Sequence, residues 1–168
     1  MKPSISACLG GILLLASLLA SAQQAKPGML SAEELKKVVP STYFFRGQSG
    51  AVQLRNSAGF RAQDGKLILA GFVDTSGYAA DLAEKYQGFL ITELKLDIEG
   101  SGLSPGQYGF GFTKDGKFGV MDVGANDLLS VSFKRDENLK RPVPLKIVED
   151  GGSYKLYAGK NWVSLKLK

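Results

Sequence analysis

The sequence has no histidine and only one cysteine, Cys8, in 168 residues. Without histidine the chain cannot form a Ser-His-Asp or Cys-His nucleophile system, and no imidazole is available to bind a metal. A single cysteine excludes an intrachain disulfide and a cysteine cluster for zinc or iron–sulfur. Carboxylates, lysine, arginine, tyrosine, hydroxyl groups and the backbone remain, and no motif arranges them for catalysis. We therefore predict a protein that is not an enzyme, with no catalytic residues, no metal and no cofactor.

The N-terminal segment has the pattern of a secretory signal peptide over residues 1–22. Lys2 supplies a basic start, an apolar run covers residues 9–19, and Ala20-Ser21-Ala22 is a small-x-small cleavage motif. The apolar run is shorter than the ~20 residues that a transmembrane helix needs. We predict cleavage after Ala22 and a secreted or periplasmic protein with no transmembrane segment in its mature chain; an uncleaved anchor is the alternative.

The charge balance is moderately basic, with 21 Lys and Arg against 16 Asp and Glu. The signs are interspersed, as in Lys134-Arg135-Asp136-Glu137, whereas a nucleic-acid-binding protein shows a basic stripe with few acids. We therefore expect a mixed, solvated surface and no nucleic-acid partner. Cys8 falls within the signal segment, so the mature chain is expected to be free of disulfides.

The mature chain is expected to have a flexible lead-in over residues 23–30 and a single β-rich domain over residues 31–168. Ser31 and Glu34 have the spacing of a capping box, which predicts a short helix that ends at Pro40. A second helix is indicated by apolar residues that recur every four positions from Tyr78 to Tyr86. Thr75 or Ser76 is expected to cap this helix, and Gly88 to close it.

The rest of the domain reads as short strands separated by turn residues at intervals typical of sandwiches and barrels. With only one internal helix, parallel crossovers are scarce, so the pairing should be mainly antiparallel. We predict an antiparallel β-sandwich with two short helices, or alternatively a small β-barrel. The expected strands cover 42–46, 51–56, 60–63, 66–75, 89–98, 106–113, 117–123, 129–134, 145–149, 153–158 and 162–167.

Asp115-Gly116 predicts a hairpin with a two-residue turn. This register pairs Phe112 with Gly119 and Phe110 with Met121, and it places the aromatic ring of Phe112 over the bare glycine backbone. The opposite face would be nearly as apolar, since it carries Phe118 and more glycine. The hairpin should therefore be central, either covered on both sides or forming the wall of a cavity.

A second hairpin is predicted around a Gly159-Lys160 turn, which pairs Tyr157 with Trp162. The alternation along these strands puts leucine and valine on one face and leaves the two aromatic residues on the more polar face. Flat aromatic rings beside hydrogen-bonding groups suit a sugar or planar ligand. Tyr157 and Trp162 are therefore the candidate ligand-binding residues, although a cross-strand pair that only stabilises the hairpin gives the same pattern.

Asp122, Asn126 and Asp127 could offer oxygen ligands to calcium, but their spacing matches no EF-hand, and an Asx-rich turn explains them. Together the patterns favour an exported, non-enzymatic β-domain that binds a small ligand, a glycan or an envelope partner. A β-barrel carrier of a small apolar ligand and a carboxylate-based hydrolase are the alternatives.

Overall fold

The computed structural model describes residues 26–168, of which 56% lie in strands and 9% in two short helices. The predicted signal peptide with its cleavage site at Ala22, and Cys8, lie outside the described residues. The mainly β, antiparallel class with two helices is confirmed. The barrel alternative is wrong, because each of the two sheets ends in edge strands that remain unjoined.

The larger sheet has eight strands, in the order β1-β3-β4-β5-β8-β9-β10, with β2 paired to β3 outside this path. Its bounds are β1 Gly28–Met29, β2 Thr42–Phe45, β3 Gln48–Arg61, β4 Leu67–Val73, β5 Gly88–Thr92, β8 Gly106–Phe112, β9 Lys117–Met121 and β10 Asp127–Ser132. The smaller sheet has six strands, in the order β12-β13-β14-β6-β7, with β11 paired to β14. Its bounds are β6 Leu96–Ile98, β7 Ser101–Leu103, β11 Lys134–Arg135, β12 Val143–Asp150, β13 Ser153–Gly159 and β14 Asn161–Leu167.

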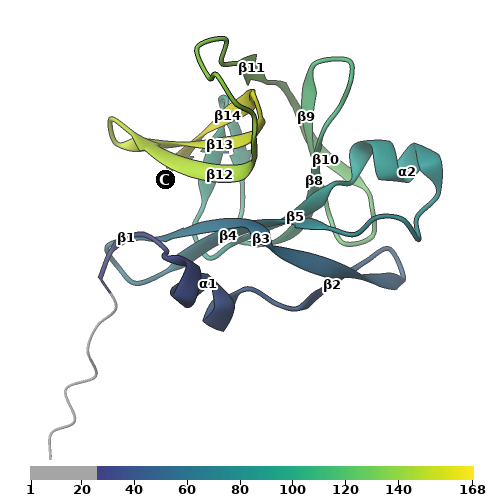
Figure 1. Ribbon diagram of the computed structural model, residues 1–168, viewed down its shortest axis with the longest axis horizontal. Coiled ribbons are helices and arrows are strands. Elements are labelled where there is room, and N and C mark those ends of the chain that lie inside the picture. The colour runs from purple at the N-terminus through teal and green to yellow at the C-terminus, as the bar shows by residue number, and fades with distance from the viewer. Residues whose placement is uncertain (1–25) are drawn as a thin grey trace, which may run out of the picture.

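The larger sheet is covered on both faces. In Figure 1, β12, β13 and β14 lie above β3 and β4, whereas helix α1 (Ala32–Val38) and β2 lie below them. Strand β4 contributes to both apolar clusters, since Ile68 packs among residues of the two sheets and Leu69 packs on the other side with Tyr43 and Phe45. The nearly continuous apolar run of β4 therefore reflects burial on both faces, as its sequence predicts.

The first helix forms as predicted. The Ser31 hydroxyl accepts a hydrogen bond from the Glu34 amide, and the Glu34 carboxylate accepts one from the Ser31 amide, which completes the capping box. The second helix, α2 (Ala80–Lys85), starts later than predicted, and neither Thr75 nor Ser76 caps it. Gly88 does not close it either, because this glycine lies in β5, where its bare Cα lets the Gly71 carbonyl approach closely.

Several strand boundaries also differ from the prediction. The polar segment 56–59 does not form a turn, because pairing with β4 resumes at Ser57 and holds β3 as one strand after an irregularity. The strand expected over 89–98 is two strands, β5 and β6, and β7 and β11 were not foreseen. Gly28 and Met29 of the expected lead-in pair with β3, so these two residues belong to the larger sheet.

The predicted register of the β8–β9 hairpin is wrong by one residue. Gly116 adopts φ 83° as the last residue of a three-residue loop, closed by hydrogen bonding between Thr113 and Lys117. Phe112 therefore pairs with Phe118, and Gly119 pairs with Gly111. A one-residue shift reverses the faces, so Phe118 joins the core between the sheets while Gly119 lies on the opposite face.

The paired glycines Gly111 and Gly119 lie in different surroundings. A Cβ built on Gly111 would lie 2.1 Å from the carbonyl oxygen of Lys85, because the end of α2 rests directly on β8. A Cβ on Gly119 would meet nothing within 4 Å. The cover provided by α2 thus ends between β8 and β9.

We predict opposite effects of alanine at these two positions. Gly111→Ala should lower the free energy of unfolding by about 1–3 kcal/mol, since α2 must move away from β8. Gly119→Ala should leave it unchanged or raise it, because alanine loses less backbone freedom on folding than glycine does. Urea denaturation of both variants measures the difference, and equal effects would contradict the position of α2.

Candidate functional site

The β13–β14 hairpin has the predicted register, with Tyr157 directly opposite Trp162. Their ring centroids lie 6.2 Å apart with an interplanar angle of 31°. Tyr157 is only 9% exposed, and its hydroxyl donates a hydrogen bond of 3.2 Å to Asp136 Oδ2. Burial and this hydrogen bond both raise the pKa of Tyr157. Tyr157 therefore faces the chain between β11 and β12 and offers little surface to a ligand.

Trp162 is half-buried, and two ammonium groups lie close to its ring. Lys134 Nζ is 4.8 Å and Lys155 Nζ is 4.5 Å from the ring centroid, which is within the range of cation–π attraction. Ion pairs with Glu99 and Asp150 hold the two lysines in place. A ligand that stacks on Trp162 has to compete with these cations, so ligand binding by Tyr157 and Trp162 stays a prediction.

The loop after β9 is organised by the side chain of Asp122. Its carboxylate accepts hydrogen bonds from the Gly124 amide, the Asn126 amide and the Asn126 side-chain amide, each at 2.9 Å. Hydrogen bonds from Asn126 and Gly124 hold the pKa of this carboxyl below its usual range. The oxygen atoms that could serve calcium are thus used to fold an Asx-type turn.

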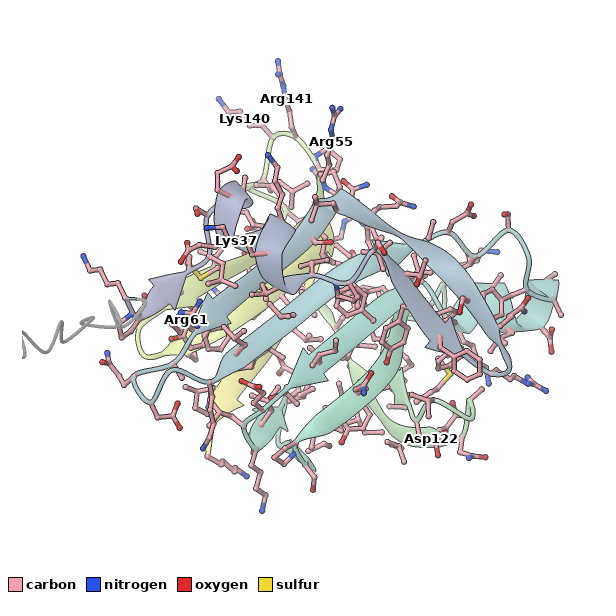
Figure 2. The ribbon with its side chains drawn as sticks, turned by 90° about the horizontal axis from the view of Figure 1, so that it is seen from below. Lys37, Arg55, Arg61, Asp122, Lys140 and Arg141 are labelled. Carbon is pink, nitrogen blue, oxygen red and sulfur yellow. The ribbon has the colours of Figure 1, made fainter. Side chains whose placement is uncertain are left out.

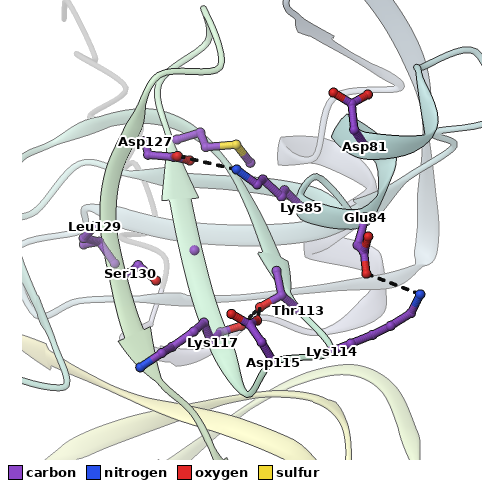
Figure 3. Close-up of a pocket in the computed structure, with 12 residues that line it drawn as sticks. Asp81, Glu84, Lys85, Thr113, Lys114, Asp115, Lys117, Asp127, Leu129 and Ser130 are labelled. Atoms are coloured by element: carbon purple, nitrogen blue, oxygen red, sulfur yellow. Dashed lines mark hydrogen bonds and ion pairs between the residues drawn. The ribbon is translucent and has the colours of Figure 1, made fainter.

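A trough of about 560 Å³ runs along β9 and β10 beside α2, on the face of the larger sheet that points away from the smaller sheet (Figure 3). Few side-chain atoms rise from its floor. Gly119, which has no side chain, and Ser130, which has a small one, are cross-strand partners there. Met121 and Leu129 also line it, but Met121 is only 1% exposed and Leu129 packs against the core between the sheets. The trough therefore begins where the cover of α2 ends.

Charged side chains of both signs surround the trough. Lys85 of α2 reaches Asp127 of β10 at 3.7 Å, and Lys114 reaches Glu84 at 3.3 Å. The dashed lines in Figure 3 mark these pairs, together with the hydrogen bond between Thr113 and Asp115. Within residues 26–168, no group of three or more Asp, Glu, Cys or His side chains could hold a metal ion. The rim thus offers hydrogen-bond donors and acceptors but no metal centre.

The sequence did not point to this trough. Asp81 and Lys85 have the spacing of an ion pair within one helix, but Lys85 instead reaches Asp127, which is distant in the chain. The signal that could have been used is the run of small residues on neighbouring strands, Gly119 on β9 with Ser130 and Ser132 on β10. With the wrong hairpin register, Phe112 was expected to cover Gly119 and to fill this space.

No family model, curated protein or solved structure matches this chain. None of the helices within residues 26–168 combines the length and the apolar character needed to cross a membrane. The geometry of the trough and of its charged rim is therefore the basis for a proposed function.

The surroundings of Trp162 predict a charge-selective fluorescence response, and Trp162 is the sole tryptophan of the sequence. Relative to free N-acetyltryptophanamide, the ratio of iodide to caesium quenching should be raised, because the ammonium groups of Lys134 and Lys155 lie against the ring. Lys155→Met should reduce this preference, whereas the control Lys37→Met on α1 should retain it. A quenching ratio equal to that of free N-acetyltryptophanamide would contradict the position of the lysines.

Proposed function

We propose that the protein is an exported, non-enzymatic binding domain on an antiparallel β-sandwich, and that it holds a small polar ligand in the trough beside α2. The observation that carries this proposal is the open floor at Gly119, where a side chain would have free space, beneath a rim of charged groups. The volume of about 560 Å³ falls in the range of small-molecule sites.

The alternating charges of the rim favour an uncharged ligand rich in hydroxyl groups. A hydroxyl both donates and accepts hydrogen bonds, so it can bind the ammonium of Lys85 or the carboxylate of Asp127. An anion or a cation would be attracted by one group and repelled by the other. A neutral glycan unit is therefore the ligand class that fits best.

Binding is favoured over hydrolysis by the way in which the lining carboxylates are engaged. A glycosidase places two carboxyl groups across a cleft, free to act on the bond between them. Here three of the four lining carboxylates, Glu84, Asp115 and Asp127, are each bonded to another residue of the lining, so Asp81 has no second free carboxyl group across the trough. The alternative of an apolar carrier lacks its scaffold, because it requires a closed barrel.

The ligand proposal is tested by filling the trough floor. Gly119→Leu should fold normally, since the space above Gly119 is empty, and it should weaken the binding of neutral glucose or N-acetylglucosamine oligosaccharides at least tenfold. Gly102→Leu is the matched control, because Gly102 is also a strand glycine with nothing within 4 Å of a built Cβ. Amide chemical shifts in an NMR titration report both affinity and location.

Shifts that cluster at Gly119 and Ser130, and that disappear in Gly119→Leu alone, are the expected result. Shifts that cluster at Trp162 would move the site to the aromatic pair and contradict the trough. An absence of shifts with every oligosaccharide would contradict the proposed ligand class.

Export is supported by the sequence of residues 1–22 and by the lack of cysteine in residues 26–168, which suits an oxidising compartment. The intact mass of the exported protein should correspond to a chain that starts at Gln23. A mass that retains Met1 would show that the segment is not removed and would favour a membrane anchor.

A further inference from the structure

Basic side chains, all but Lys36 without an ion-pair partner among residues 26–168, gather along one edge of the molecule, where α1, β3 and β12 meet. We call this surface the basic edge and define it by Lys36, Lys37, Arg55, Lys140, Arg141 and Lys146, all of which are exposed. Figure 2 shows Lys140, Arg141 and Arg55 projecting from the same side of the molecule, with Lys37 on α1 next to it. Asp122 lies toward the opposite side.

The folding of α1 brings three elements of the basic edge together. Leu35 is the buried residue of α1, and a hollow of about 200 Å³ beside it is lined by Lys36, Leu54 and Arg55. A second hollow, of about 270 Å³, lies between Leu35 and Lys146 of the edge strand β12. Basic residues of α1, β3 and β12 therefore lie around the contact that Leu35 makes with the larger sheet.

The carboxylates of α1 offset only part of the charge of this surface. Glu33 pairs with Lys36 at 2.7 Å, and Glu34 accepts hydrogen bonds from the amide and the hydroxyl of Ser31 and keeps its negative charge near Lys37. Within residues 26–168, no carboxylate lies within ion-pair distance of Lys37, Arg55, Lys140, Arg141 or Lys146. The other ion pairs lie elsewhere, so a large part of the net charge of +5 is concentrated here.

Apolar side chains are exposed among these cations. Leu54 is 38% exposed next to Arg55, and Met29 is 41% exposed on β1 at the rim of the second hollow. A soluble polyanion needs only the cations, whereas a lipid surface also accepts apolar side chains below its headgroups. Exposed apolar side chains next to unpaired cations distinguish the basic edge from a patch that acts by charge alone.

We propose that the basic edge binds the surface of a membrane that contains anionic lipids, with Leu54 and Met29 entering the headgroup layer. This contact is independent of the trough, which lies on β9, β10 and α2. Each basic side chain near an anionic surface contributes attraction that salt screens. The interaction is therefore reversible and sensitive to ionic strength.

The test is co-sedimentation with vesicles of phosphatidylcholine that contain about one third phosphatidylglycerol, compared with pure phosphatidylcholine. The wild-type protein should bind the anionic vesicles only, and high salt should release it. Reversing two charges of the basic edge, in Lys37→Glu with Arg55→Glu, should weaken binding roughly tenfold or more. The matched control, Lys95→Glu with Lys160→Glu, changes the net charge equally outside the basic edge and should retain binding.

The apolar contribution needs a separate variant. Leu54→Ser should weaken vesicle binding without changing net charge, and soluble polyphosphate should compete only poorly with vesicles. Undiminished binding of Leu54→Ser, or full competition by polyphosphate, would overturn the lipid assignment in favour of a soluble polyanion. Failure to bind anionic vesicles, or equal losses in the two charge-reversal variants, would overturn the proposal itself. Gly119→Leu should bind vesicles normally, which separates this result from that of the trough.

Discussion

Close contact between bulky groups and bare glycine backbone determines how the outer face of the larger sheet is covered. A Cβ on Gly109 would lie 2.4 Å from the ring of Phe45, and a Cβ on Gly111 would lie still closer to the Lys85 carbonyl. Phe45 in turn stacks on Tyr86 with ring centroids 3.9 Å apart, so β2 and the end of α2 are held on β8 together. Since protein interiors are closely packed, larger residues here would displace both elements.

The trough is a consequence of where this cover stops. The rings of Phe45 and Tyr86, together with α2, cover β8 on this face of the sheet. On the same face β9 and β10 carry only Gly119, Ser130 and their neighbours. Helix α2 on β8 forms the wall of the trough, and the uncovered strands β9 and β10 form its floor. The trough therefore needs no cavity inside the core. Lys85 crosses from the wall to Asp127 on the edge strand and gives the rim its charges.

The parts of the fold that the sequence predicts correctly depend on local interactions. The capping box of α1 and the turn at Gly159 need only residues close in the chain, and both form as expected. The β8–β9 register fails because an Asp-Gly pair fits both a two-residue turn and the end of a three-residue loop, and the hydrogen bonds of Thr113 select the second. The trough could not be predicted from the wrong register, because Phe112 then covers Gly119. Its rim also joins residues that are far apart in the sequence, such as Lys85 and Asp127.

Charge is distributed differently on the two proposed surfaces, and this difference separates their roles. Around the trough, lysines and carboxylates pair with each other, so the field there is short-ranged and suits recognition by hydrogen bonds. Along the basic edge only Lys36 has such a partner, so the field of Arg55 and the other cations extends to about a Debye length, near 10 Å. Figure 1 places α1 and β12 on one side and α2, β9 and β10 on the other. On the two proposals, docking through the basic edge does not cover the trough, which lies on α2, β9 and β10 at the other end of the molecule.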